Sequence, residues 1–292
     1  MTLEQLRIFI AVAEQQHVTK AAKNLNLTQS ATSSAVAALE ARYGVRLFDR
    51  IGRGIVLTRT GRDFLNEARA VLARAQVATQ VLGDLAGLKR GSLSIAASQT
   101  AANYWLPSRI QTFQETYPAI DLKIAIANTE QVASAVHQGR ADLGFVEGDI
   151  DDPALAIHEI EGDSLIVVVG AKHPWFGRKK VTPRDLTKSS WVLREPGSGS
   201  RSMFEAALRK MGVDPSHFRI ALELPSNEAV RAAVESGDCA TAISDLVVKA
   251  SVATGTLHRV EIELPRRSFF WLRHNERYAS HAEKALIASF RI

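Results

Sequence analysis

The sequence has only one cysteine, Cys239, so no disulfide can form within the chain. This excludes a disulfide-stabilised scaffold and leads us to expect a cytoplasmic protein in a reducing compartment. No stretch approaches the ~18 uncharged apolar residues that a membrane-spanning helix needs. The first 22 residues contain Glu4, Arg7, Glu14 and Lys20 and no small-residue cleavage site. We therefore expect neither a secretory signal nor a membrane partner.

Motifs of the common enzyme classes are also missing. The chain has no Gly-x-x-x-x-Gly-Lys loop, no His-Glu-x-x-His pair and no Gly-x-Gly-x-x-Gly after a strand. The stretch Gly197-Ser198-Gly199 lacks the spacing of a serine hydrolase elbow. The histidines are scattered, and Cys239 lies in an apolar segment typical of an inert buried thiol. We expect no enzyme activity, no metal and no cofactor.

What the chain does have is material for hydrophobic cores and an uneven distribution of charge. It is 46% hydrophobic and 23% charged over 292 residues, which excludes a disordered protein and allows one large or two ordinary domains. Residues 1–90 carry 13 Lys and Arg against 7 Asp and Glu, whereas the other 202 residues carry 23 against 24. A basic block beside a near-neutral body is typical of a nucleic-acid-binding module joined to another domain. A solvated basic face would give the same charges.

The basic block has the pattern of a winged helix-turn-helix. Apolar spacing predicts helices over 3–15, 18–25 and 29–43, with Thr19 capping the second, Thr28 capping the third and Gly44 ending it. Residues 45–48 and 54–57 are predicted as two short strands of a wing. The third helix begins with small polar side chains, which suit contacts to base edges and phosphates. We expect the DNA contacts to come from Gln29, Ser30, Thr32, Ser33 and Ser34, with Arg50 and Arg53 of the wing on the flanking backbone or minor groove.

A long helix without proline is predicted from Thr60 to about Leu85. Its apolar residues alternate four and three apart, which is the a/d spacing of a two-stranded coiled coil. We expect a homodimer held by Phe64, Ala68, Val71, Ala75, Ala78 and Leu82. The alternative is a helix that packs on the core of its own domain.

The first 65 residues resemble the DNA-binding domain of LysR-type transcriptional regulators. The matching segments are FIAVAEQQHVTKAAKNLNLTQSATSSAVAALEARYGVRLFDR and VLTRTG. Thr32 stands where the family usually has valine, and Ser34 where many members have arginine or glutamine. The resemblance implies binding to double-stranded promoter DNA, contact with RNA polymerase, and a homodimer that assembles to a homotetramer.

The rest of the chain alternates between strand and helix patterns, which indicates an α/β domain with a largely parallel sheet. The predicted strands are 93–97, 122–127, 143–146, 165–170, 191–193, 221–224, 240–243 and 269–272. The predicted helices are 104–116, 130–138, 202–211, 228–235 and 279–289. This part is similar to the effector-binding domain of LysR-type regulators, which implies a two-lobed fold like that of periplasmic binding proteins.

The resemblance also sets the expected domain boundaries. Residues 1–59 are the winged helix-turn-helix domain, 60–90 the linker helix and hinge, and 91–292 the effector-binding domain. Lobe I holds about residues 91–162 and 267–292, and lobe II about 163–266. The segments IANTEQVASAVHQGRADLGFVEG and LREPGSGSR most resemble the subgroup that regulates sulfur assimilation, sulfite reduction and carbon fixation.

Polar residues follow predicted strands at three points where a helix begins, near Ser98, Thr129 and Ser198. Free N–H groups and hydroxyls at helix starts suit an anion, although Ser and Thr at such positions are also ordinary caps. The resemblance implies that these points converge between the lobes. We expect the effector to contact Ser98, Gln99, Thr100, Thr129, Glu147, Arg194, Glu195, Ser198, Ser200 and Arg201. Arg194 and Arg201 would supply countercharge, and Glu195 is equally consistent with a surface ion pair.

The sequence therefore predicts a LysR-type transcription factor that responds to a small anionic effector. An inorganic sulfur oxyanion such as sulfite ranks first, on the subgroup resemblance, and a small organic acid second. The alternative is a cytoplasmic solute-binding or sensing module whose basic N-terminal third is a protein-interaction arm. Salt-dependent binding to a specific duplex distinguishes the two.

Overall fold

The computed structural model describes residues 1–51, 54–85, 91–178, 181–262 and 264–290. These form two compact units, the first built on Met1–Leu88 and the second on Lys89–His137 and Ala141–Ile292. Each unit has its own hydrophobic clusters.

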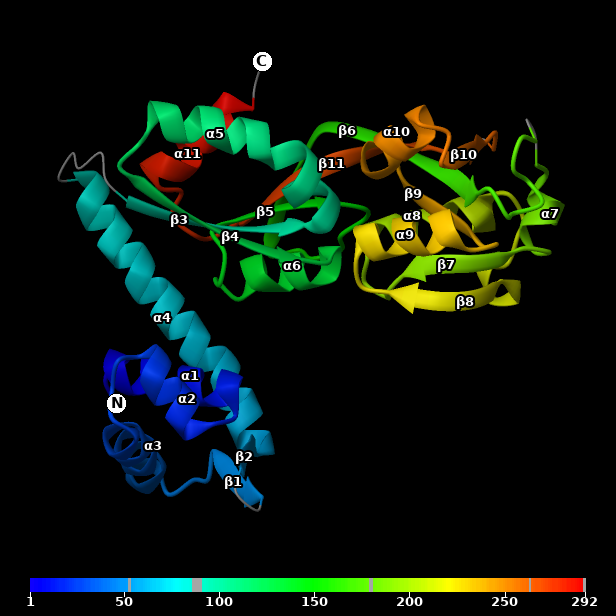
Figure 1. The fold of residues 1–292 in the computed structure, drawn as a ribbon. Coiled ribbons are helices and arrows are strands. Elements are labelled where there is room, and N and C mark those ends of the chain that lie inside the picture. The colour runs from blue at the N-terminus through cyan, green and yellow to red at the C-terminus, as the bar shows by residue number, and fades with distance from the viewer. Residues whose placement is uncertain (52–53, 86–90, 179–180, 263, 291–292) are drawn as a thin grey trace. The chain divides into compact units, whose positions relative to one another are not determined.

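The first unit consists of three short helices, a hairpin and a long helix (Figure 1). The elements are α1 Leu3–Gln15, α2 Val18–Asn24, α3 Gln29–Tyr43, β1 Phe48–Ile51, β2 Gly54–Leu57 and α4 Arg59–Leu85. Thr28 caps α3 by accepting a hydrogen bond from the Ala31 N–H at 3.2 Å, and Gly44 ends this helix with φ +63°, both as predicted. The predicted cap of α2 was wrong. His17, not Thr19, takes that position and its Nδ1 accepts from the Lys20 N–H at 3.4 Å.

The first strand of the hairpin starts at Phe48 and not at residue 45 as predicted. A side chain of α3 binds the N–H groups at this point of the chain. The Glu40 carboxylate accepts from the N–H groups of Leu47 and Phe48 at 2.7 and 3.1 Å. Strand pairing therefore begins only at Phe48, which faces Leu57. The rings of Phe48 and Phe9 pack at a tilt of 59° with centroids 5.5 Å apart, so the wing is anchored to the core of the unit.

The second unit has a nine-stranded sheet in the order β4-β3-β5-β11-β6-β9-β7-β8, with β10 also paired to β6 (Figure 1). The strands are β3 Gly91–Ser98, β4 Ile120–Ala127, β5 Leu143–Glu147, β6 Leu155–Gly170, β7 Ser190–Arg194, β8 Arg219–Leu224, β9 Ala240–Ser244, β10 Leu257–Val260 and β11 Arg266–His274. The pairs β3–β4, β3–β5, β7–β8 and β7–β9 are parallel, whereas every pair that contains β6 or β11 is antiparallel. The sheet is thus mixed rather than largely parallel.

Two lobes share this sheet, and each is a helix–sheet–helix sandwich. The helices are α5 Leu106–Thr116, α6 Thr129–His137, α7 Pro183–Leu186, α8 Gly199–Lys210, α9 Asn227–Ser236, α10 Asp245–Ala253 and α11 His281–Ser289, with a π-helix η1 at Ala101–Trp105 and a 3₁₀ turn η2 at Pro215–His217. In lobe I, α5 and α11 cover one face and α6 the other; in lobe II, α7 and α8 lie opposite α9 and α10 (Figure 1).

The strands β6 and β11 connect the lobes. Along Leu155–Ser164 β6 pairs with β11, and from Leu165 onward it pairs with β9 and β10. The sequence predicted only the apolar half of β6, because residues 156 to 164 lack an apolar pattern and none of them is fully buried as a whole residue. The elements α7, α10 and β10 were also missed.

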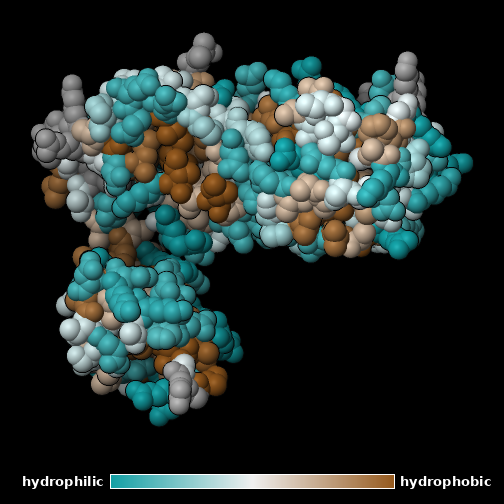
Figure 2. All heavy atoms as spheres, viewed as in Figure 1, coloured by the Kyte–Doolittle hydropathy of each residue, from teal (hydrophilic) through white to brown (hydrophobic). Residues whose placement is uncertain are grey.

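Several exposed apolar side chains of the second unit lie on the outer strands of its sheet. Ile124 and Ile126 on β4 are exposed, as are Ile220 and Leu222 on β8. Figure 2 shows brown, apolar surface over both regions and mostly polar surface where the lobes meet. On this face, the lobe junction lies between the two apolar regions and is mostly polar.

Candidate functional site

The start of α3 presents a polar surface beside the wing. Gln29, Ser30 and Ser34 are exposed and Ser33 is half-buried. A groove of about 250 Å³ runs between the start of α2, α3 and the wing, and its lining includes Gln29, Ser33 and Arg50. A helix-turn-helix requires that the second helix of the motif, here α3, presents side chains that can reach base edges.

One expected DNA contact is wrong. The Thr32 side chain is fully buried, and its hydroxyl donates to the main-chain oxygen of Thr28 at 3.0 Å. It faces the interior because it lies on the same side of α3 as Val36 and Leu39, which are also buried. Arg53, the other expected wing contact, lies outside the described residues.

The expected dimer stripe on α4 divides into two parts. Phe64 and Ala68 pack into the first unit's own core with Leu6 and Phe9, so these two positions were wrongly assigned to a partner helix. Farther along, Val71 is 42% exposed and Leu82 69% exposed, while Ala75 is half-buried and Ala78 exposed. The alternative of a helix on its own domain's core thus holds for the first turns of α4 only.

At the lobe junction of the second unit, the expected hydroxyl groups converge on the carboxylate of Glu147, at the end of β5. Ser98 donates to its Oε2, while Thr100 and Ser200 donate to its Oε1 at 3.3 and 3.4 Å. Ser98 and Thr100 come from the end of β3 in lobe I, whereas Ser200 comes from the first turn of α8 in lobe II. Glu147 is only 2% exposed, so its charge is satisfied by these donors and not by water.

A buried arginine completes this cluster. Arg267, at the start of β11, places Nη1 3.7 Å from Glu147 Oε1 and donates from the same atom to Ser200 Oγ at 2.8 Å. Its Nε and Nη2 both bind the carboxylate of Asp163 on β6, the second bond at 2.5 Å. Burial opposes charge on Arg267, but Asp163 and Glu147 outweigh it and raise the pKa of the guanidinium. Two carboxyl groups, those of Glu147 and Asp163, thus face one guanidinium, that of Arg267.

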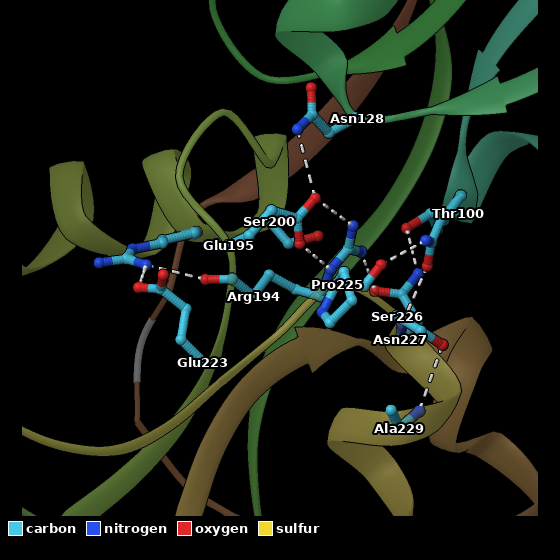
Figure 3. Close-up of polar contacts among 12 residues, drawn as sticks. Thr100, Asn128, Arg194, Glu195, Ser200, Glu223, Pro225, Ser226, Asn227 and Ala229 are labelled. Carbon is cyan, nitrogen blue, oxygen red and sulfur yellow. Dashed lines mark hydrogen bonds and ion pairs between the residues drawn. The ribbon is translucent and has the colours of Figure 1, made fainter. Parts of the chain in front are cut away.

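A second chain of polar contacts joins the lobes beside this cluster (Figure 3). Arg194, at the end of β7, makes two hydrogen bonds to Glu195 at 2.8 and 3.0 Å and one to Asn227 Oδ1 at 2.5 Å. Asn128 of lobe I donates to Glu195 at 3.3 Å. Burial raises the pKa of Glu195, but the bonds from Arg194 and Asn128 outweigh burial, and the pKa lies below its usual value. Arg194 is thus neutralised within the protein.

Of the remaining expected residues, Thr129, Gln99 and Arg201 form hydrogen bonds to main-chain atoms. Thr129 donates to the main-chain oxygen of Glu147 at 2.8 Å, and Gln99 bonds to both Pro225 O and the Asn227 N–H. Ser198 is buried at the N-cap of α8. Arg201 is held by Glu205, Glu223 and the main-chain oxygen of Arg194.

Glycine is required where the two lobes touch. A Cβ added to Gly199 would lie 2.0 Å from the Glu147 main-chain oxygen and 2.6 Å from Thr129 Oγ1. Gly197 has φ +85°, a backbone conformation that other residues rarely adopt. The close approach of α8 to β5 therefore depends on the Gly197-Ser198-Gly199 segment.

Sequence reasoning missed three central residues, Asp163, Asn227 and Arg267. Asp163 and Arg267 lie at the two boundaries predicted between the lobes, outside the predicted strands 165–170 and 269–272. The one available signal is that Arg267 is the second residue of the strand segment RRSFFWLRH, just before an apolar run, where a charged residue needs a buried partner.

The described residues contain no group of three or more His, Cys, Asp and Glu side chains placed to hold a metal ion. Among the helices of the same residues, none is both long enough and apolar enough to cross a membrane, and this includes the 27-residue α4.

Two family models match the chain. "Bacterial regulatory helix-turn-helix protein, lysR family" matches residues 3–62, and "LysR substrate binding domain" matches residues 86–291. The HTH-type transcriptional regulator YeiE of Escherichia coli K12 is 33% identical over 287 residues, which cover 97% of this chain and 94% of that protein. A probable RuBisCO transcriptional regulator of Cyanophora paradoxa is 30% identical over 288 residues, covering 97% and 89%.

Solved structures share the fold. A variant of full-length OxyR from Pseudomonas aeruginosa has a TM-score of 0.71 at 23% identity, covering 100% of this chain and 95% of that one. Full-length CbnR in complex with its target DNA has a TM-score of 0.70 at 24% identity, covering 100% and 99%. The family matches decide against an enzyme and against a solute-binding module that lacks DNA binding. The chain belongs to the LysR family of transcriptional regulators and combines a helix-turn-helix DNA-binding domain with a substrate-binding domain.

Proposed function

We propose that this regulator binds promoter DNA as a homodimer that assembles to a homotetramer, and that a small anionic metabolite controls it. The metabolite binds between the lobes and shifts their relative orientation. This shift changes DNA bending and the contact with RNA polymerase. Since the DNA lies in the cytoplasm, the protein acts there.

One observation carries the choice of an anion. The hydroxyls of Ser98, Thr100 and Ser200, drawn from both lobes, already converge on a carboxylate, that of Glu147. Fixed donors that satisfy a buried carboxylate have the polarity and the spacing that a carboxylate or inorganic oxyanion ligand needs. The remaining expected residues support the site by holding α6, α8 and α9 around these hydroxyls.

Within the anions, we rank a sulfur oxyanion such as sulfite first and a small organic acid second. The first rests on the resemblance of residues 126–148 and 193–201 to regulators of sulfur metabolism. The second is supported by relatives named as RuBisCO transcriptional regulators. Calorimetry on the full-length chain with sulfite, sulfate, malonate and uncharged acetamide separates these classes. Heat from acetamide alone would overturn the proposal of an anionic effector.

On the DNA side, we propose that Gln29, Ser30, Ser33 and Ser34 read bases in the major groove and that Arg50 contacts the flanking backbone. Gln29, Ser33 and Arg50 line the groove between α3 and the wing, and Ser30 and Ser34 are exposed on the same helix, which supports these roles. Mapping the bound sites across the genome identifies the operator, and the regulated genes then narrow the choice of metabolite. Sites without a common sequence would contradict base reading by α3.

A further inference from the structure

The carboxylate of Glu147 occupies the position where the proposed effector would bind. It accepts hydrogen bonds from three hydroxyls and lies 3.7 Å from the guanidinium of Arg267. Ser200 serves both groups, because its hydroxyl donates to Glu147 and accepts from Arg267 at 2.8 Å. With Glu147 in place, none of these three hydroxyls has its proton available for another acceptor.

The local charge adds to this obstacle. Arg267 is shared between Glu147 and Asp163, and its two bonds to Asp163 are the shorter contacts. Arg194 and Arg201 are each paired with carboxylates of their own. An anion that enters beside the Glu147 carboxylate therefore meets like charge in a buried environment, where such repulsion is strong.

From these contacts we infer that Glu147 is an internal ligand of the effector site and determines its specificity. This inference rests on the proposed function, in which an anion binds between the lobes. The effector competes with Glu147 for the hydroxyls of Ser98, Thr100 and Ser200. Only a charged oxyanion offers these donors acceptors as strong as the carboxylate that it displaces, so neutral molecules are excluded.

The same contacts explain how displacement would be transmitted. Glu147, Ser98 and Thr100 belong to lobe I, whereas Ser200 opens α8 in lobe II. The main-chain oxygen of Glu147 also lies against Gly199, at the lobe contact. Moving the carboxylate out of this cluster removes a link between the lobes, and the incoming anion replaces it with a different geometry.

The test compares the full-length wild type with Glu147→Gln, which has nearly the same shape without the charge. The control is Glu115→Gln on the exposed surface of α5, where the same chemical change lies outside the cluster. Calorimetry with sulfite and malonate measures anion affinity. Hydrogen exchange without any anion measures how firmly residues 98–101 and 199–202 are held.

We expect Glu147→Gln to bind the anion that wild type prefers about tenfold more tightly, or more, because repulsion and competition are both removed. Exchange of the two segments should be several-fold faster in this variant, since a neutral amide bridges the lobes less firmly. Glu115→Gln should match wild type in both measurements.

The outcomes separate this inference from the proposed function. If wild type binds an anion and Glu147→Gln binds it equally or more weakly, Glu147 is not an internal ligand, while the proposal of an anionic effector stands. Binding by Glu147→Gln alone supports the inference and shows that the carboxylate closes the site. If neither protein binds an anion, the proposed effector class is wrong. Hydrogen exchange of residues 98–101 and 199–202 then tests whether Glu147 bridges the lobes. Faster exchange in Glu147→Gln supports the bridge, and unchanged exchange overturns it.

Discussion

The side-chain amide of Asn227 donates a hydrogen bond to the hydroxyl of Thr100 at 3.2 Å and so joins the start of α9 in lobe II to the end of β3 in lobe I. Asn227 in turn accepts from Arg194, and Thr100 donates to Glu147. A continuous polar chain therefore runs from Arg194 to the proposed effector site. A ligand that takes over the Thr100 hydroxyl acts directly on a contact between the lobes.

Removing the Thr100 hydroxyl should have an effect that depends on Glu147. In the Glu147→Gln background, Thr100→Ala should weaken anion binding by about 1–3 kcal/mol, because a donor to a charged ligand is lost. In wild type the same substitution should cost less binding free energy. There it also removes the hydrogen bond from Thr100 to Glu147, so the competitor of the anion is weakened as well. Calorimetry on the four proteins of this cycle measures the difference. Equal losses in both backgrounds would show that effector and Glu147 do not share Thr100.

The DNA-reading and backbone roles should separate by mutation. Gln29→Ala should cost about 1–3 kcal/mol at particular base pairs, because a base-edge contact is lost. Arg50→Ala should weaken binding to every duplex and reduce the salt slope by about 1, because a phosphate contact is lost. Fluorescence titrations with specific and random duplexes at several salt concentrations measure both effects. If Gln29→Ala lowers the affinity for the specific and the random duplex by the same factor, as Arg50→Ala should, Gln29 does not read bases.

Thr32 should contribute to stability and not to base preference. Thr32→Val keeps the buried volume but removes the bond to the Thr28 oxygen, which should cost about 0.5–1.5 kcal/mol of unfolding free energy. Ser34→Ala, on the exposed side of the same helix, should leave stability within about 0.5 kcal/mol. Denaturant unfolding and selection of preferred duplexes are the measurements. A change of preferred sequence in Thr32→Val would place this side chain at the DNA after all.

The outer part of α4 should carry the dimer contact. Leu82 is exposed in the single chain, so Leu82→Asp should disrupt the dimer without unfolding the first unit, and DNA affinity should fall as two half-sites separate. Gln76→Asp, exposed but off the apolar stripe, is the control. Ala68→Asp should instead destabilise the unit itself, because Ala68 is buried in its core. Sedimentation of Leu82→Asp as wild type would remove the coiled-coil interpretation.

His173 should make lobe II less stable in acid. Burial lowers the pKa of its imidazole below the ordinary value of 6.5. Nδ1 accepts from the Trp175 N–H at 3.0 Å, and in that tautomer Nε2 donates to Ser189 at 2.8 Å. The unfolded chain therefore binds a proton more readily, and stability that is complete above about pH 6.5 declines as pH falls below it.

An NMR titration of His173 and denaturant unfolding between pH 7.5 and 5.5 check this dependence. His217→Gln, at an exposed position, should leave the decline unchanged, whereas His173→Gln should reduce it. A His173 pKa at or above 6.5 would contradict the expectation.

Much of the fold could be predicted because its signals are local. The cap at Thr28 and the helix end at Gly44 depend on a few neighbouring residues, and the alternation of strands and helices follows from apolar runs. Where a segment's structure depends on distant partners, prediction failed. The half of β6 before Leu165 forms because it pairs with β11, about 110 residues away, and not because of its own pattern.

The sequence by itself therefore determined the two kinds of domain and the hydroxyl groups of the proposed site. Only the tertiary structure decided that Thr32 faces the core, that Phe64 and Ala68 pack within their own domain, and that the three hydroxyls meet on Glu147. These outcomes depend on which faces are buried when helices and lobes pack together. Burial then makes an unpaired carboxylate costly. The three hydroxyls that bond to Glu147 lie 47 to 53 residues away in the sequence, and Arg267 lies on another strand.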